Sequence, residues 1–232
     1  MGEDSGHKGS EDLAGALRPI ASTLVLSQHA RPAVAKVLDP IGRALLRLGL
    51  TPDSVTVIGT VGVSAAALIL YPRGSLLAGT LVIAVFALAD SIDGTMARLS
   101  GRSSRWGAFL DSVLDRVSDA AIFGGLTLWF VAEGSTWGVP LSLAALVLGQ
   151  LVSYTRARAE GLGAEASVGL AERAERLILV LLAAAAVGLG LPAAVLVAAM
   201  GVLVVLSAIT VGQRVVVVWR QLHEPSSEPA EG

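Results

Sequence analysis

The sequence predicts an all-α integral membrane protein with six transmembrane helices and an N-terminal amphipathic helix in the membrane interface. Hydrophobic residues make up 53% of the 232 residues and charged residues only 16%, and the mean hydropathy is +0.70. A soluble domain has more charge and spaces its apolar residues with the period of an amphipathic helix or strand. Here the apolar residues form continuous blocks, many of them near the ~20 residues that a membrane-spanning helix needs.

The N-terminal part of the chain contains the predicted interfacial helix. Residues 32–49 place apolar side chains on one side of a helix and Lys36, Arg43 and Arg47 on another. This pattern is typical of a helix that lies in the plane of the interface. The Thr-Pro-Asp sequence at 51–53 then predicts a turn and an N-cap for the first span.

Six apolar blocks follow as predicted spans, at 54–72, 75–97, 108–132, 138–157, 175–192 and 194–219. The membrane domain is therefore expected to cover 31–220. Residues 1–30 are polar and expected to be partly disordered, and the polar, proline-rich tail at 221–232 is expected to be disordered.

The lysines and arginines predict the orientation of the spans. If both chain ends share one side, nearly all basic loop residues fall on that side, and the opposite loops contain only Arg73. The positive-inside rule then places the basic side in the cytoplasm. We expect a multi-pass protein of the cell membrane whose active site faces the cytoplasm.

Four aspartates interrupt the apolar pattern where the second predicted span ends and the third begins. Asp90 and Asp93 are three residues apart and Asp111 and Asp115 four apart, so each pair lies on one helical face. A short basic loop joins the two helices as a hairpin, so the faces can meet. Converging carboxylates repel at low dielectric, so either several are protonated or cations lie between them. Two Mg²⁺ ions would balance four carboxylates and would suit displacement at phosphorus.

Small and basic residues lie between these acids. Gly94 and Ala97 would let a ligand approach the helix backbone, Gly107 gives the third span a second small face, and Arg98 is placed to bind a phosphate oxygen. Taken singly, each has an ordinary interpretation: an aspartate as a helix cap, a glycine for packing, loop arginines for topology. Two face-matched pairs of acids with glycine and arginine between them fit a phosphate-transfer site better.

The complete string resembles the signature of the CDP-alcohol phosphotransferases without a departure: Asp90-x2-Asp93-Gly94-x2-Ala97-Arg98-x8-Gly107-x3-Asp111-x3-Asp115. The resemblance covers about residues 33–220 and implies that family's six-helix membrane fold and a homodimer. It also implies that the four aspartates bind two Mg²⁺ ions, with Mn²⁺ as a possible substitute. Asp115 would in addition be the general base.

The resemblance also implies a site for a CDP-linked lipid, CDP-diacylglycerol. Its nucleotide and diphosphate would contact residues of the signature and its loop, namely Gly94, Ala97, Arg98, Ser104 and Gly107. A second element, "PDSVT" at 52–56, resembles the family's Pro-Asn-x-x-Thr element with aspartate in place of asparagine, which keeps an acceptor but removes the amide donors. It adds four expected donor-site residues, Asp53, Ser54, Val55 and Thr56.

The acceptor is predicted from the second half of the chain. The stretches "SYTRARAE" at 153–160 and "ERAERL" at 172–177 resemble the actinobacterial phosphatidylinositol phosphate synthases, whose acceptor is 1D-myo-inositol 3-phosphate and whose second product is CMP. Independently, arginines at the same ends of three different spans are typical of a phosphate site. The expected acceptor-phosphate residues are Ser153, Arg156, Arg173, Arg176 and Arg214. The competing interpretation, that these arginines only set the topology, explains Arg173 and Arg176 poorly, because Glu172 and Glu175 already dilute the charge of that loop.

Two other functions stay open at this point. A phosphatidylglycerophosphate synthase with glycerol 3-phosphate as acceptor would need the same kind of phosphate site. A divalent-cation transporter would use the acids as a pathway, but it should carry polar residues across the whole bilayer, and stretches such as 61–70 and 181–190 are almost wholly apolar. The expected partners are CDP-diacylglycerol, inositol phosphate, membrane lipids and a second copy of the chain, and no nucleic acid.

Overall fold

The computed structural model describes residues 38–101, 104–170 and 172–223, without the side chains of residues 88–91. Every regular element in these ranges is a helix: α2 (Pro52–Leu70), α3 (Leu76–Ser100), α4 (Arg105–Ala132), α5 (Gly138–Glu160), α6 (Arg173–Gly188) and α7 (Ala194–His223). These helices coincide with the six predicted blocks to within a few residues at most ends. Residues 38–47 are also helical and belong to the predicted interfacial helix, whose first residues, 32–37, lie outside the described part.

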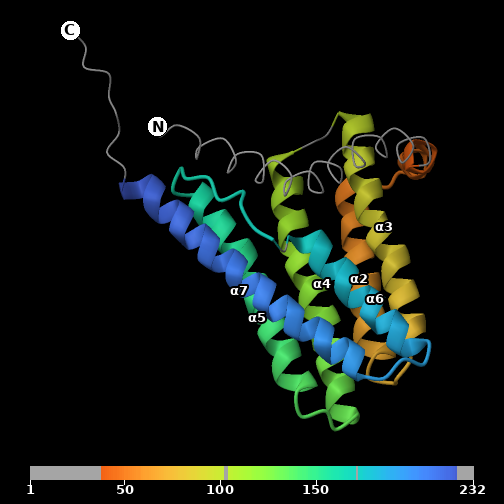
Figure 1. Cartoon of the computed structure of the whole chain (residues 1–232). Helices are drawn as coiled ribbons and strands as arrows, with labels where there is room; N and C mark the ends of the chain where they lie inside the picture. Colours follow the sequence, from red (N-terminus) through yellow and green to blue (C-terminus); the bar gives the residue numbers. More distant parts are fainter. Residues whose placement is uncertain (1–37, 102–103, 171, 224–232) are drawn as a thin grey trace, which may run out of the picture.

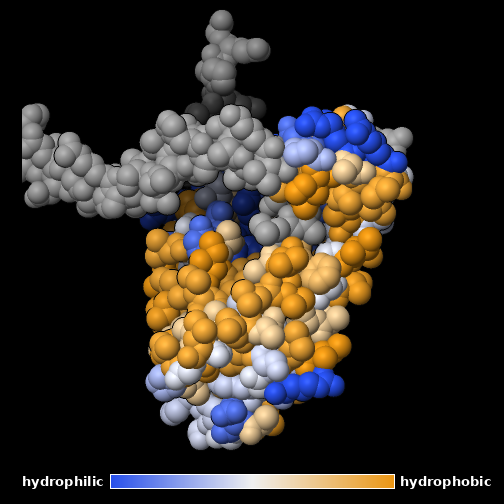
Figure 2. Space-filling view, turned by 90° about the vertical axis from the view of Figure 1, so that its right-hand side faces the viewer, coloured by the Kyte–Doolittle hydropathy of each residue, from blue (hydrophilic) through white to orange (hydrophobic). Residues whose placement is uncertain are grey.

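Four helices, α2, α3, α5 and α7, are long and apolar enough to cross a membrane. Helix α6 has 16 residues and covers about 24 Å at 1.5 Å per residue, which is less than the ~30 Å hydrocarbon core of a bilayer. Helix α4 is long enough, but its first half contains five charged residues, from Arg105 to Asp119 inclusive. The face shown in Figure 2 has a broad hydrophobic band across its middle, with hydrophilic residues toward both ends.

The six helices close into a ring. The main packing contacts among the described residues join α2 to α3, α3 to α6, α6 to α7, α7 to α5, α5 to α4, and α4 back to α2 (Figure 1). The sequence predicted a hairpin of the second and third spans with the acidic faces turned to each other. In the structure, α2 packs extensively against both α3 and α4, so direct helix-to-helix packing is not what brings the two acidic helices together.

Two helix pairs, α2 with α4 and α3 with α6, pack with their backbones in close contact. A Cβ atom on Gly125 would lie 2.3 Å from the carbonyl oxygen of Ala67, so α4 and α2 touch backbone to backbone. A Cβ atom on Gly188 would lie 2.5 Å from the amide nitrogen of Leu77. Small residues at such crossings are a general feature of helix packing in membranes. The main core is built of apolar side chains from all six helices, with Phe123 and Phe130 fully buried near its centre.

Candidate active site

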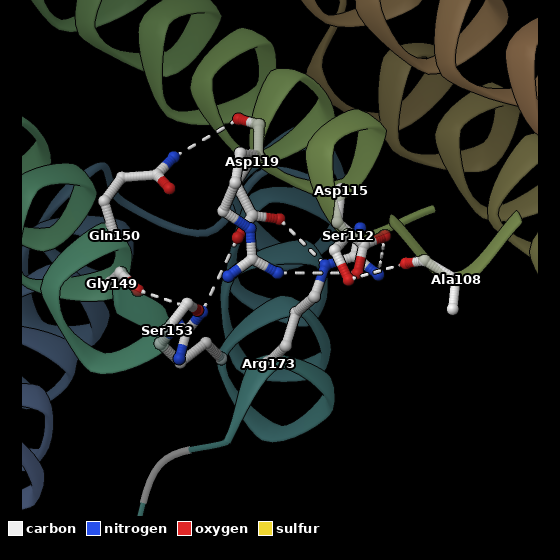
Figure 3. Close-up of polar contacts among 10 residues, drawn as sticks. Ala108, Ser112, Asp115, Asp119, Gly149, Gln150, Ser153 and Arg173 are labelled. Atoms are coloured by element: carbon white, nitrogen blue, oxygen red, sulfur yellow. Dashed lines mark hydrogen bonds and ion pairs between the residues drawn. The ribbon is translucent and has the colours of Figure 1, made fainter. Parts of the chain in front are cut away.

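A cavity of about 720 Å³ opens between α4, α5, α6 and α7. Its wall contains all five residues that the sequence predicted for the acceptor phosphate: Ser153, Arg156, Arg173, Arg176 and Arg214. Asp115, the predicted general base, also lines it. Residues from helices far apart in the sequence are therefore brought to one place, with the carboxylate of Asp115 on α4 facing Arg173 on α6 (Figure 3).

Arg173, the first residue of α6, joins two carboxylates of α4. Its Nη1 lies 2.8 Å from Oδ1 of Asp115, and its Nε donates a hydrogen bond of 3.2 Å to Oδ1 of Asp119 (Figure 3). The two aspartates are four residues apart, so both project from one face of α4. Arg173 therefore fixes the direction of the carboxylate of Asp115, the predicted general base.

Asp119 is a site residue that the sequence analysis did not identify. It is 4% exposed and lies between the two arginines at the start of α6, with its Oδ2 3.5 Å from Nη2 of the equally buried Arg176. The signal was present in the sequence, because Asp119 continues the face of Asp111 and Asp115 by one more turn.

Arg116 and Gln150 were also missed. Arg116 lines the cavity, and its Nη2 lies 3.4 Å from Oδ2 of Asp115. Gln150 lines the same wall, and its Nε2 donates to the backbone oxygen of Arg116 across 3.2 Å (Figure 3). Arg116 lies one residue beyond the last position of the signature, Asp115, so neither spacing nor helical face singled it out.

The two remaining arginines of the cavity have partners within the chain. Arg214 on α7 is 2% exposed, and it donates from Nε to the backbone oxygen of Val168 across 2.8 Å and from Nη1 to that of Val152. It thus fastens the α5–α6 connection to both α5 and α7. Arg156 is exposed and forms an ion pair of 3.0 Å with Glu160, one turn along α5. Exposed pairs of this kind contribute little to stability.

Some of the predicted donor-site residues lie at the starts of α2 and α4. Thr51 caps α2 as predicted, with Pro52 in the first turn and a reciprocal hydrogen-bond pair to Ser54. Ser104 caps α4, and its hydroxyl accepts from the amide of Gly107 across 2.9 Å. A Cβ atom on Gly107 would lie 3.5 Å from Oδ1 of Asp53, so the two elements adjoin.

The other donor-site residues lie along α2 and the end of α3. Val55 is buried, whereas Thr56 donates from Oγ1 to Oδ2 of Asp93 across 2.5 Å. A Cβ atom on Gly94 would meet no described side chain or backbone atom within 4 Å, a statement that does not include the side chains of residues 88–91. Arg98 is exposed and donates to Oγ1 of Thr95 across 3.0 Å, and Ala97, one residue before it, is half-buried.

Comparison with known proteins identifies the family. The sequence model described as CDP-alcohol phosphatidyltransferase matches residues 49–222, which includes every helix from α2 to α6 and nearly all of α7. The chain belongs to the CDP-alcohol phosphatidyltransferase family.

Individual family members are closely similar to this CDP-alcohol phosphatidyltransferase. The phosphatidylinositol phosphate synthase of Streptomyces avermitilis is 46% identical over 222 residues, which cover 93% of this chain and 91% of that protein. A crystal structure of the Mycobacterium tuberculosis phosphatidylinositol phosphate synthase with CDP-DAG bound matches with a TM-score of 0.76 at 44% identity, covering 80% of this chain and 94% of the other. A second crystal structure of that enzyme, in complex with manganese and citrate, matches with a TM-score of 0.74 at 44% identity, covering 78% of this chain and 88% of the other.

The acids of this CDP-alcohol phosphatidyltransferase have the chemistry of a site for hard divalent cations, which prefer oxygen ligands. Thr56, which donates to Asp93 of α3, and Asp115 of α4 line the same small cavity of about 40 Å³. Asp93 itself is not among the described residues that line it. Among the described side chains, which do not include that of Asp90, no three potential ligands gather closely enough to hold a metal ion. The four-aspartate metal centre therefore stays a prediction, in which Asp90, Asp93, Asp111 and Asp115 are the ligands.

Proposed function

We propose that this protein transfers the phosphatidyl group of CDP-diacylglycerol to a hydroxyl of 1D-myo-inositol 3-phosphate and releases phosphatidylinositol phosphate and CMP. The observation that supports this most directly is the arginine-lined cavity with Asp115 in its wall. Arginines presented by several helices bind a phosphate dianion in a fixed orientation. The names of the similar synthases point to the same acceptor.

In this proposal the arginines of the cavity hold the phosphate of the acceptor and thereby place one of its hydroxyls beside Asp115. Arg173 and Arg176 enter from α6, Arg156 and Ser153 from α5, and Arg214 from α7. Asp115 then takes the proton of the attacking hydroxyl as general base. Arg173 fixes the direction of the Asp115 carboxylate, since its Nη1 lies 2.8 Å from Oδ1.

The donor lipid lies on the other side of Asp115 in the proposed arrangement. Its nucleotide and diphosphate contact the starts of α2 and α4 and Gly94 of α3, while its acyl chains stay in the bilayer. Two Mg²⁺ ions, replaceable by Mn²⁺, would supply charge stabilisation on the diphosphate and the leaving CMP when bound by the four aspartates.

The membrane arrangement is part of the same proposal. All six helices α2 to α7 cross or enter the membrane, the stretch around 38–47 lies in its interface, and the site faces the cytoplasm. The enzyme lies in the plasma membrane. The two water-soluble compounds, inositol phosphate and CMP, then exchange directly with the cytoplasm. The functional unit is a homodimer.

A panel of acceptors tests the proposal. Purified protein in detergent or vesicles is supplied with CDP-diacylglycerol, Mg²⁺ and one labelled acceptor at a time: 1D-myo-inositol 3-phosphate, free myo-inositol, glycerol 3-phosphate or serine. We expect CMP release and a labelled lipid with inositol phosphate and little of either with the others. Preferential use of glycerol 3-phosphate would replace the proposed acceptor while leaving the family assignment intact.

A further inference from the structure

Asp119 lies behind the cavity and not in its wall. The residues that line the cavity include Arg173 and Arg176 but not Asp119, which is 4% exposed. A group in that position does not touch an acceptor in the cavity. Any effect it has on the reaction must pass through the two arginines in front of it.

Each carboxylate oxygen of Asp119 interacts with a different arginine of α6. Oδ1 accepts from Nε of Arg173 across 3.2 Å, and Oδ2 forms an ion pair of 3.5 Å with Nη2 of Arg176. A carboxylate is rigid, so this arrangement sets the spacing and direction of two guanidinium groups that would otherwise rotate about long side chains. Figure 3 shows Arg173 reaching from α6 to both Asp115 and Asp119 on α4.

Gly149 on α5 also adjoins Arg176. A Cβ atom on Gly149 would lie 3.3 Å from Nε of Arg176, which is tighter than ordinary van der Waals contact. Arg176 therefore adjoins both the carboxylate of Asp119 on α4 and the bare backbone of α5. It is only 2% exposed, so its guanidinium has little room for any other position.

The charge of this group favours an anion. Ion pairs connect five residues here: Arg116, Arg173, Arg176, Asp115 and Asp119. The three arginines and two aspartates give this group a formal charge of one positive unit. Asp119 thus compensates part of the buried positive charge without cancelling it. A phosphate that enters the cavity finds guanidinium groups that are already oriented, one of them buried, which lowers the ordering cost of binding.

We propose that Asp119 is a positioning residue for the acceptor: it holds Arg173 and Arg176 in the geometry that binds the acceptor phosphate. This proposal rests on the proposed function, because it assumes a phosphorylated acceptor in the cavity. The competing explanation is that Asp119 only neutralises a buried arginine and so stabilises the fold. The two explanations differ in which kinetic constant a substitution changes.

The first test is Asp119→Asn, which keeps the shape of the side chain and one acceptor oxygen but removes the charge. We expect the KM for 1D-myo-inositol 3-phosphate to rise about tenfold or more, the effect of weakening one charge-assisted hydrogen bond. The KM for CDP-diacylglycerol should stay within about twofold, and kcat at saturating acceptor should fall less than the acceptor KM rises. Arg158→Ala is the matched control, because Arg158 is an exposed arginine of α5 outside the cavity wall.

A binding measurement separates positioning from chemistry. Calorimetric titration of purified protein with 1D-myo-inositol 3-phosphate, without CDP-diacylglycerol, should give a Kd for Asp119→Asn raised by about the same factor as the acceptor KM. A purely structural role would instead lower kcat or the active fraction and leave the Kd of the folded protein unchanged. That result would overturn the proposal.

Coupling to Arg176 gives a second criterion. If Asp119 acts through the α6 arginines, the acceptor KM of the double variant Asp119→Asn/Arg176→Ala should stay well below the value obtained by multiplying the two single effects. Fully multiplicative effects would contradict the proposal. Gly149→Ala leaves Asp119 intact but pushes on Arg176, and we expect it to raise the acceptor KM by about three- to tenfold.

Gly149→Ala also decides the matter if Asp119→Asn does not fold. An acceptor KM and Kd unchanged in Gly149→Ala would then overturn the proposal. Failure of the proposed function is distinguishable: if the wild type uses glycerol 3-phosphate, the same variants are compared with that phosphate, and only an unchanged affinity for it counts against Asp119.

Discussion

Thr56 of α2 and Asp93 of α3 are joined by a hydrogen bond of 2.5 Å, from the threonine Oγ1 to Oδ2 of the aspartate. The same hydroxyl lies 3.1 Å from the backbone oxygen of Pro52, but it has one hydrogen, and the shorter bond to a buried carboxylate is the stronger one. The element at 52–56 is therefore connected physically to the acidic signature, 37 residues further along the chain.

Thr56→Val removes this hydroxyl at nearly constant volume. We expect the free energy of unfolding to fall by about 1.5–3 kcal/mol, the usual contribution of a hydrogen bond to a charged group such as Asp93. We also expect half-maximal CMP release to require a higher Mg²⁺ concentration. Thr80→Val is the matched control, since it removes a buried hydroxyl bonded to Tyr71 at the opposite end of α3. The control should lower the Tm without shifting the Mg²⁺ dependence, and an equal shift in both variants would refute a specific role for Thr56.

Asp93→Asn and Asp111→Asn should each abolish CMP release while leaving a folded membrane protein. Each change removes one negative charge from the predicted metal site, which lies on α3 and α4. The measurement is CMP release together with the elution profile and Tm of the purified variant. Turnover near that of the wild type in either variant would show that the four-aspartate centre is wrong.

Removal of divalent cations should inactivate the enzyme reversibly. Excess chelator should stop CMP release, and added Mg²⁺ or Mn²⁺ should restore it, because the four predicted metal-binding carboxylates would otherwise repel the diphosphate of the donor. Ca²⁺ and a monovalent salt at equal ionic strength serve as controls for screening. Full activity in the presence of chelator would exclude a metal-dependent mechanism.

Arg176→Ala and Arg98→Ala should separate the two substrates. Loss of an acceptor-binding arginine should raise the KM for inositol phosphate about ten- to a hundredfold, with little change for CDP-diacylglycerol. Arg98 lies at the end of α3, away from the arginine cavity, so its loss should impair donor use instead. Steady-state kinetics with both substrates varied would decide this, and a normal acceptor KM in Arg176→Ala would remove Arg176 from the acceptor site.

Single cysteines test the orientation cleanly, because the natural sequence has none. Ser135→Cys lies in the short turn between α4 and α5, and Arg158→Cys lies near the other end of α5. An impermeant thiol reagent added to intact cells should label the first and not the second. Labelling of Arg158→Cys alone would invert the proposed topology.

The helices of this fold could be predicted from the sequence, but their packing order could not. Long apolar blocks reveal each helix independently, whereas the insertion of α2 against α4 depends on a missing side chain at Gly125 opposite Ala67. That contact joins residues far apart in the chain and leaves no periodic trace. The short apolar block at 175–192 already indicated the limited length of α6. It did not indicate where the neighbouring helices would end.

The arginines that line the cavity were predicted from the sequence, but the residues that support them were missed. Charge at equivalent ends of three helices was sufficient to gather Arg156, Arg173 and Arg214 around one cavity. Asp119 could have been found by extending the helical face of Asp111 and Asp115 one turn. The bonds of Arg214 to Val152 and Val168 could not, because they depend on the path of the connection between α5 and α6.

The short α6 has a consequence for how the substrates meet. Helix α5 has 23 residues and α6 has 16, a difference of about 10 Å in length, and the chain between them descends to reach the start of α6 (Figure 1). Arg173 and Arg176, in the first turn of α6, therefore lie below the end of α5 and line the cavity there. In a bilayer such a cavity would carry the boundary between water and lipid inward at one point. A sugar phosphate that cannot dissolve in oil and a lipid that cannot leave it then become neighbours, and neither has to change phase.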